Sequence, residues 1–198
     1  MDIMIIVYAV LAYFIGSIPS GLIIGKTFFN TDVRQYGSKN IGATNTYRVI
    51  GLKAALPVFL CDALKGAAGV VLLSSYGPMY MILGGILAMM GHNWSIFLGF
   101  KGGRGVATGL GVLIALSPLV ALICFLVWGV IVYFTKLVSL GSIIAAALVP
   151  VLMYITGESY WFVGFGGLAA LFVIVRHWDN IKRLLAGNEL KVERIKKD

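Results

Sequence analysis

Residues 106–175 decide the fold: 106-VATGLGVLIALSPLVALICFLVWGVIVYFTKLVSLGSIIAAALVPVLMYITGESYWFVGFGGLAALFVIV-175. The only charged side chains in this stretch are Lys136 and Glu158. A helix that crosses a lipid bilayer needs about 20 mostly apolar residues, so the stretch is long enough for several. Its turn-like breaks are Ser117-Pro118, Thr135-Lys136 and Thr156-Gly157-Glu158-Ser159. The pattern therefore predicts four consecutive apolar segments joined by short turns.

The whole chain has the composition of an integral membrane protein. Of its 198 residues, 60% are hydrophobic and 12% are charged, whereas soluble domains carry roughly 25% charged residues. So few charges could not cover the surface of a soluble protein, and they also exclude a disordered chain, a coiled coil and a disulfide-rich secreted scaffold. Because Cys61 and Cys124 lie in apolar runs, we expect two buried thiols rather than a disulfide.

Three more apolar segments precede residue 106, and they are residues 3–25, 54–75 and 79–98. The polar parts of the chain are short and basic, and they are residues 26–53, 101–105 and 176–198. None of them is long enough to form a domain by itself. We therefore expect an all-α membrane helix bundle that forms one domain over residues 1–198.

The basic segments predict how the helices run. Lys and Arg concentrate on the cytoplasmic side of membrane proteins, and if all three basic segments share that side, residues 106–175 cross the membrane an even number of times. The total is then seven helices or, alternatively, five. We favour seven, with the N-terminus outside and the C-terminus inside, because every Lys and Arg except the intrahelical Lys65 is then cytoplasmic. Residues 106–117 are too short to span and are expected to cross half-way or to tilt.

The first polar segment contains a glycine-rich motif, 37-GSKNIGATN-45, followed by Arg48. Glycines allow tight turns with positive φ, and successive N–H groups in such turns form concavities that hold anions. Arg48 adds a planar fork that matches phosphate oxygens. An ordinary polar loop would have a similar composition, so the residues alone leave the two interpretations evenly balanced.

A second motif, 101-KGGRGVAT-108, stands directly before an apolar segment. It places two cations, Lys101 and Arg104, and three glycines where a helix is expected to begin. Free N–H groups and the helix dipole favour an anion at such a position. The alternatives are charges that only set the membrane orientation and glycines that only allow helices to pack closely.

A third motif, 177-HWDNIKRLLAGNE-189, follows the last apolar segment. In a helix, Asn180 shares a face with His177 and with Arg183. An imidazole at the membrane boundary can bind phosphate or transfer a proton. The alternative is an amphipathic helix in the membrane interface, which explains this motif better when the motif is taken alone.

Several polar residues lie within the apolar segments. Asp62 and Lys65 are three residues apart, so we expect a local ion pair. His92-Asn93 is near the basic end of its segment, where lining a site and hydrogen bonding between helices are equally plausible. The residues whose spacing favours close approach of a neighbouring helix are Ser17, Gly21 and Gly25.

Several chemistries are excluded by patterns that the sequence lacks. It contains no Gly-x-Ser-x-Gly, His-Glu-x-x-His, Cys-x-x-Cys or Gly-x-Gly-x-x-Gly motif and no visible nucleic-acid-binding module. With two histidines, two cysteines and eight carboxylates, neither a metal site nor a cofactor is expected. What remains is a set of anion-binding groups at one membrane face, which suits phosphorylated, lipid-like substrates.

Together the three motifs resemble those of the bacterial acyl-phosphate:glycerol-3-phosphate acyltransferases, the PlsY family. The resemblance rests on Gly-Ser-x-Asn-x-Gly-Ala-Thr-Asn, Lys-Gly-Gly-Arg-Gly-Val-Ala-Thr and His-x-x-Asn-Ile-x-Arg-Leu-Leu-x-Gly-x-Glu in that order, and it covers essentially the whole chain. Arg104 stands where some members carry Lys, which keeps the charge and replaces a point donor with a fork.

The resemblance implies a multi-pass enzyme of the bacterial inner membrane whose active site faces the cytoplasm. It implies transfer of a fatty acyl group from acyl phosphate to the sn-1 hydroxyl of glycerol 3-phosphate, giving lysophosphatidic acid and phosphate, the first step of phospholipid synthesis. By resemblance, the catalytic residues are Ser38, Arg48, His177 and Asn180. The substrate-binding residues are Asn40, Gly42, Ala43, Thr44, Asn45, Lys101, Gly102, Gly103, Arg104, Gly105, Arg183 and Glu189.

The implied reaction fits the residues present. Acyl phosphate already has a good leaving group, so we expect no covalent acyl-enzyme and a site that holds two phosphates close together. The departing phosphate is the expected base, since the second pKa of ordinary phosphomonoesters is about 6, and His177 is its rival. A phosphate or organic-anion transporter is the alternative, although we find no internal repeat. The sequence leaves the oligomeric state open.

Overall fold

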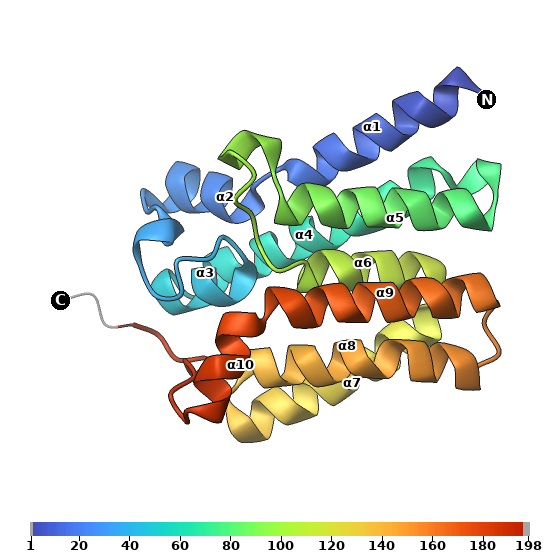
Figure 1. The fold of residues 1–198 in the computed structure, drawn as a ribbon. Coiled ribbons are helices and arrows are strands. Elements are labelled where there is room, and N and C mark those ends of the chain that lie inside the picture. Colours follow the sequence, from blue (N-terminus) through green and yellow to red (C-terminus); the bar gives the residue numbers. More distant parts are fainter. Residues whose placement is uncertain (1, 196–198) are drawn as a thin grey trace.

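The structure, a computed structural model, describes residues 2–195 and is all-helical over that range (Figure 1). This confirms the all-α fold predicted from hydropathy. The α-helices are α1 Ile3–Ser17, α2 Ser20–Phe29, α3 Ala43–Val49, α4 Leu52–Leu72, α5 Pro78–Asn93, α6 Val106–Leu116, α7 Pro118–Thr135, α8 Val138–Ile155, α9 Tyr160–Arg176 and α10 Trp178–Leu185. Three short 3-10 helices are η1 Val33–Gln35, η2 Ser74–Tyr76 and η3 Ile96–Leu98.

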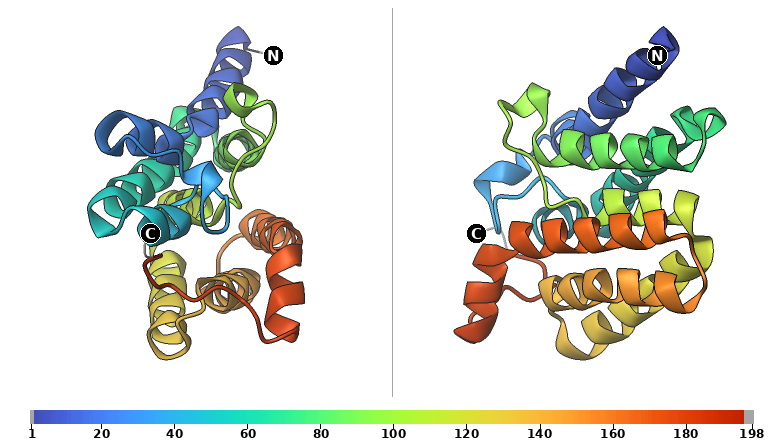
Figure 2. Two further views of the ribbon diagram at one scale, coloured as in Figure 1. Left: turned by 90° about the vertical axis from the view of Figure 1, so that its left-hand side faces the viewer. Right: turned by 45° about the vertical axis from the view of Figure 1, so that its right-hand side comes forward.

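The longer helices run between two ends of a bundle (Figure 1). One end carries α2, α3, the loop before α6, the α7–α8 turn and α10. The start of α1 and the α4–α5, α6–α7 and α8–α9 turns lie at the other end (Figures 1 and 2). All three polar motifs therefore gather at the same end of the molecule, as the sequence analysis expects of them.

The bundle has two parts that differ in how they pack. In the first part, α4 packs against α1, α5 and α6, and α1 packs against α5. In the second part, α8 lies between α7 and α9. Helices of the first part approach closely through glycine: a Cβ on Gly66 would fall on the Thr108 carbonyl, and a Cβ on Gly84 would fall on the Gly69 carbonyl. Small residues at contacts are how membrane helices come together.

The first apolar segment is not one helix to Gly25, as we expected, but a bent pair. α1 and α2 meet at 46°, because Pro19 has no N–H to continue the hydrogen-bond ladder. The backbone carbonyl of Ile18 at this break accepts a hydrogen bond from Lys65 Nζ at 2.9 Å. Gly21 and Gly25 do allow close approach, but the groups that approach are the carbonyls of Ile41 and Thr31 in the polar segment, not a neighbouring membrane helix.

Within the part of the chain that the structure describes, four helical stretches are long and apolar enough to cross a membrane, or up to six if each of two bent pairs counts as one span. The four are Leu52–Tyr76, Pro78–Leu98, Pro118–Thr135 and Val138–Ile155, and the pairs are α1 with α2 and α9 with α10. The three breaks predicted within residues 106–175 are confirmed. Helix α6 has only 11 residues, so it is too short to span, as expected.

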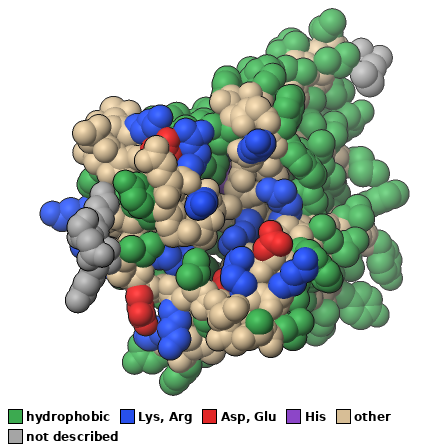
Figure 3. All heavy atoms as spheres, turned by 60° about the vertical axis from the view of Figure 1, so that its left-hand side comes forward, with side chains coloured by type: hydrophobic (Ala, Val, Ile, Leu, Met, Phe, Trp, Pro, Cys, Tyr) green, Lys and Arg blue, Asp and Glu red, His purple; other side chains and the backbone are tan. Residues whose placement is uncertain are grey.

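The surface of the bundle is apolar along its sides and basic at one end. Lys and Arg side chains gather around a hollow at the end that carries the three motifs, whereas hydrophobic side chains cover the flanks (Figure 3). Both cysteines are free, as predicted, but Cys61 is exposed and only Cys124 is buried. The expectation for Cys61 was wrong because an apolar run in a membrane protein can face lipid as well as the core.

Candidate active site

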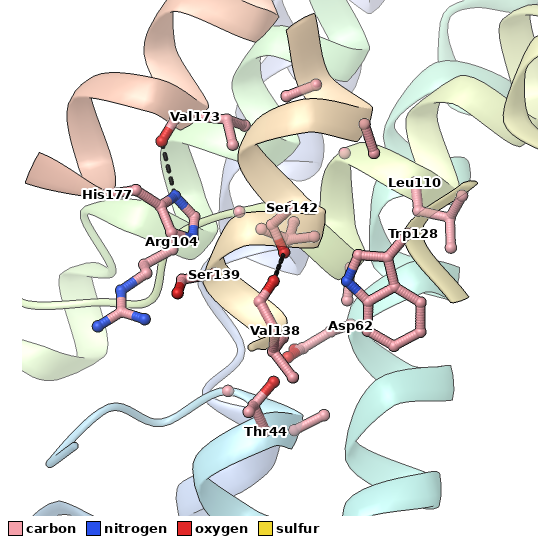
Figure 4. Close-up of a pocket in the computed structure, with 18 of the residues that line it drawn as sticks. Thr44, Asp62, Arg104, Leu110, Trp128, Val138, Ser139, Ser142, Val173 and His177 are labelled. Carbon is pink, nitrogen blue, oxygen red and sulfur yellow. Dashed lines mark hydrogen bonds between the residues drawn. The ribbon is translucent and has the colours of Figure 1, made fainter. Parts of the chain in front are cut away.

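A pocket opens between the two parts of the bundle and joins a polar mouth to an apolar interior (Figure 4). The polar residues that line it include Ser38, Asn40, Thr44, Arg48, Arg104, Ser139, His177, Asn180 and Glu189. The apolar residues include Leu113, Phe125, Trp128, Val149, Phe165 and Ala169. One cavity thus offers cations and hydrogen-bond donors to a polar group and a hydrocarbon wall to an apolar one.

The structure brings together most of the residues predicted from the three motifs. Those that line the pocket are Ser38, Asn40, Gly42, Ala43, Thr44, Asn45, Arg48, Arg104, Gly105, His177, Asn180 and Glu189. Four predicted residues do not line it, and they are Lys101, Gly102, Gly103 and Arg183. Among these, Lys101 is exposed, whereas Gly103 and Arg183 hold residues that do line the pocket.

Asn45 organises the first motif from within. Its side-chain oxygen accepts from the Ser38 N–H at 2.8 Å, and its amide nitrogen donates to the carbonyls of Val33, Tyr36 and Asn40. The Asn45 side chain is 1% exposed, so its hydrogen-bonding capacity is used within the loop. The structure therefore gives Asn45 the part of a loop scaffold that places Ser38 at the pocket.

The second motif is held from two sides. The carbonyls of His92 and Asn93 lie at the end of α5, where a helix leaves its last carbonyls without partners, and they accept from the Gly103 and Gly102 N–H groups. On the other side, Arg176 donates to the Gly103 carbonyl at 2.8 Å. A Cβ on Gly103 would fall on the His92 ring. These contacts fix the loop that carries Arg104.

The third motif forms the junction of α9 and α10, which meet at 61°. His177 Nδ1 lies 2.7 Å from the Val173 carbonyl, and because a carbonyl only accepts, Nδ1 carries the proton. The other ring nitrogen, Nε2, is left for the pocket that His177 lines (Figure 4). The ring is only 2% exposed, so it is fixed in place next to Arg104 and Ser139.

Glu189 ties the third motif to α8. Its carboxylate accepts from Ser139 Oγ at 3.0 Å, Asn180 Nδ2 at 2.6 Å and Arg183 Nε at 2.7 Å. A carboxylate with three donors is well satisfied. Its contacts orient Asn180, and Asn180 Oδ1 is buried and makes no hydrogen bond with the described residues.

The mouth of the pocket carries excess positive charge. Burial lowers the pKa of Arg104 to about 10, with Glu189 opposing the shift and Arg183, Arg48 and Arg176 adding to it. Burial also lowers the pKa of Arg48, and Glu189 again opposes that shift. Both arginines stay protonated at neutral pH. Since one carboxylate cannot neutralise several guanidinium groups, an anion in the pocket would be stabilised.

The residues that form the walls of the pocket could be predicted from the sequence only in part. The predicted ion pair between Asp62 and Lys65 is confirmed, at 2.7 Å, and Asp62 lines the pocket. For His92-Asn93 the sequence left two interpretations open, lining a site or hydrogen bonding between helices. His92 lines the pocket, whereas Asn93 does not.

Several lining residues were missed, and among them are Trp128, Ser139 and Ser142. The available signal was two serines three residues apart at the start of an apolar segment, a spacing that puts both on one helix face. Arg176 was missed too, because it belongs to a basic stretch whose charges serve mostly to set orientation.

A family model described as glycerol-3-phosphate acyltransferase matches residues 6–187. The chain belongs to the glycerol-3-phosphate acyltransferase family. It is 46% identical to the glycerol-3-phosphate acyltransferase of Fusobacterium nucleatum, over 93% of this chain and 96% of that protein. It is also 47% identical to glycerol-3-phosphate acyltransferase 2 of Moorella thermoacetica, over 92% and 95%.

Solved structures of PlsY (YgiH), an integral membrane glycerol 3-phosphate acyltransferase, share the fold. The glycerol 3-phosphate form has a TM-score of 0.89 and 38% sequence identity over 94% of both chains. The lysophosphatidic acid form has a TM-score of 0.87 and 37% identity over the same shares. The acyltransferase described here is thus an integral membrane enzyme of the PlsY family, and this favours the enzyme over the anion transporter considered from the sequence.

Proposed function

We propose that the enzyme transfers a fatty acyl group from acyl phosphate to the sn-1 hydroxyl of glycerol 3-phosphate. The observation that carries this proposal is the joining of a cationic mouth and an apolar interior in one pocket. An acyl phosphate has the same two halves, since its phosphate is charged and its chain is hydrocarbon. The solved relative in its glycerol 3-phosphate form supports the acceptor, and the one in its lysophosphatidic acid form supports the product.

The proposed roles follow the lining of the pocket. Arg48 and Arg104 offset the phosphate charges, while Ser38, Asn180 and His177 orient the glycerol hydroxyl and the reacting carbonyl. The other lining residues of the motifs, Asn40, Gly42, Ala43, Thr44 and Gly105, shape the phosphate-binding wall. The acyl chain lies along α7, α8 and α9 and enters sideways from the bilayer, because hydrocarbon gains nothing by leaving lipid.

The proposed reaction is a direct transfer. The sn-1 oxygen forms a bond to the acyl carbon, the bond from that carbon to the phosphate oxygen breaks, and the hydroxyl proton passes to the departing phosphate. No acyl-enzyme is needed, because phosphate is already a good leaving group. Cys124 lines the apolar interior, and its thiol donates to the Ala145 carbonyl; replacing it with alanine is expected to keep most of the activity.

His177 is the rival base, through Nε2. The variant His177→Gln separates the two possibilities. If the departing phosphate takes the proton, the variant retains measurable turnover with acyl phosphate. Near-complete inactivity with substrate binding intact would instead assign the proton to the histidine.

The donor is tested with purified protein in detergent. Release of phosphate from palmitoyl phosphate is measured with and without glycerol 3-phosphate, and palmitoyl-CoA is offered in parallel with release of CoA as the signal. We expect phosphate release that depends on glycerol 3-phosphate and little or no reaction with the thioester. Turnover of the thioester without turnover of the acyl phosphate would contradict the proposed donor.

We also propose that the chain acts as one domain of seven helices in the bacterial inner membrane, of which the short α6 crosses only part of the bilayer, with the pocket mouth in the cytoplasm. The gathering of basic residues at one end supports this orientation (Figure 3). Single cysteines introduced at Lys39 and Gly157 into a Cys61→Ala, Cys124→Ala background test it. An impermeant thiol reagent applied to intact cells should label position 157 and not position 39, and the reverse pattern would contradict the topology.

A further inference from the structure

The chain after α10 turns back across the basic end of the bundle (Figure 2). We call residues 190–195 the strap. Its Val192 N–H donates to the Lys136 carbonyl at 2.9 Å, and Arg194 donates to the Ile50 carbonyl at 3.0 Å. The strap thus joins the α7–α8 turn to the junction of α3 and α4, and these lie in different parts of the bundle. It also lies beyond residue 187, where the match to the family model ends.

The strap encloses Arg48. Arg48 Nε donates to the Lys191 carbonyl at 2.9 Å, and Nη2 donates to the Leu190 carbonyl at 2.8 Å. The Arg48 carbonyl in turn accepts from the Ile195 N–H at 2.8 Å. These hydrogen bonds hold both the backbone and the guanidinium group of Arg48 to this one segment. Arg48 is also buried, at 5% exposed.

The type of group that holds Arg48 matters for the pocket. A carboxylate would orient the guanidinium group and also neutralise it. Two backbone carbonyls orient it and leave its full charge available to an anion. The nearest carboxylate of the motif, Glu189, is instead occupied by Ser139, Asn180 and Arg183, and among the described residues Arg48 Nη1 makes no hydrogen bond.

We propose that the strap is a positioning element of the acyltransferase, which sets the Arg48 fork to receive a substrate phosphate without cancelling its charge. The inference rests on the proposed role of Arg48 in phosphate binding. A guanidinium group on a flexible side chain would have to be ordered on each binding event, which weakens binding. The strap removes that cost before the substrate arrives.

The test compares chains that end at different residues. A chain that ends at Glu189 lacks the strap but keeps the Glu189 contacts, and a chain that ends at Ile195 keeps both. We expect the shorter chain to show a KM raised about tenfold or more for glycerol 3-phosphate or for palmitoyl phosphate, with a smaller change in kcat. The longer chain should match the full protein. An unchanged KM would overturn the proposal. A gain in activity would also overturn it, because that is the result expected if the strap were an autoinhibitory tail.

A second comparison separates positioning from a general loss of stability. The variant Arg48→Lys cannot form the two-carbonyl fork, so removing the strap from it should raise KM less than twofold further. If the truncation raises KM equally in both backgrounds, or lowers the thermal midpoint enough to explain the loss, the strap is only structural and the proposal fails. If instead Arg48→Gln in the full chain keeps its full activity, the proposed role of Arg48 itself is wrong.

Discussion

Two clusters of charged side chains, each with members that line the same pocket, are built in opposite ways. The inner cluster consists of Asp62, Lys65 and His92, and it pairs one carboxylate with one ammonium group at 2.7 Å. The mouth cluster consists of Arg48, Arg104, Arg183 and Glu189, in which three guanidinium groups stand against one carboxylate that pairs only with Arg183. All three inner side chains are at most 5% exposed. Charge balance therefore distinguishes a cluster that holds helices together from one whose excess positive charge an anion would stabilise.

The inner cluster also shows how a buried pair serves the scaffold. Lys65 reaches the Ile18 carbonyl at the α1–α2 break, and His92 Nδ1 lies 3.7 Å from Asp62 Oδ1. The His92 carbonyl then holds the loop of the second motif. The cluster thus connects the first bent helix to the loop that carries Arg104.

The largest expected effect comes from breaking the balance of the inner cluster. Asp62→Asn leaves Lys65 buried without a counter-charge, and breaking a buried pair in this way costs about 3–5 kcal/mol. The free energy of unfolding, measured by denaturant titration in micelles, should fall by that amount. The double variant Asp62→Leu, Lys65→Met leaves no unpaired charge and should recover most of the loss, and failure to do so would show that the unpaired charge is not the main cost.

The mouth cluster should respond in activity instead of stability. Arg104→Gln removes a positioned cation from the proposed phosphate site and should lower kcat/KM by about 10²–10³-fold, the usual effect of losing one preorganised donor. Its thermal midpoint should not fall, because the lost charge was incompletely neutralised. Lys53→Gln, which removes an exposed cation at the same end, is the control and should stay within about twofold of the parent enzyme.

A smaller effect is expected where the two clusters meet. Gly103→Ala places a Cβ against the His92 ring, so the loop must shift and Arg104 moves with it. Steady-state assays should show kcat/KM reduced by about tenfold, since displacements of about an ångström near a reacting centre are costly. In Gly129→Ala the added carbon meets no other part of the described chain within 4 Å apart from its own stretch of helix, so this variant serves as the matched control. Equal activities of the two variants would show that the loop tolerates the shift.

The smallest effect is the response of the mouth cluster to a free anion. Inorganic phosphate should raise the thermal midpoint relative to sodium chloride of equal ionic strength, because it supplies the missing negative charge. Stabilisation by about 1 kcal/mol corresponds to roughly 2–4 °C for a chain of this size. The shift should vanish in Arg104→Gln and persist in Lys53→Gln. An equal shift in both variants would indicate a general salt effect.

Much of the fold could be predicted from the sequence because hydropathy and turn residues act locally. The breaks at Ser117-Pro118, Thr135-Lys136 and Thr156–Ser159 were found at the expected positions, and α6 is too short to span. The bend at Pro19 was missed because the apolar run continues through it without a charge. The outward position of Cys61 was missed for a related reason, since hydropathy does not tell a core face from a lipid face.

The site, like the fold, has features that could be predicted from the sequence and features that could not. Glycines, arginines and amides in three motifs indicated an anion site, and most of these residues line the pocket. Their individual roles could not be predicted. Asn45 stabilises the loop, Glu189 accepts hydrogen bonds that orient Asn180, and Lys101 lies exposed outside the pocket. These roles depend on which partner each side chain meets, and that partner can lie in another helix, as Ser139 of α8 does for Glu189.

By itself, the sequence determined that this chain is a bundle of apolar helices with basic, glycine-containing motifs between them, because bilayer thickness and charge distribution constrain each segment separately. Only the tertiary structure decided that the three motifs share one pocket with a hydrocarbon wall, and that the strap holds Arg48. Such contacts join residues as distant as Arg48 and Lys191, and their geometry comes from the packing of whole helices, which no local pattern specifies.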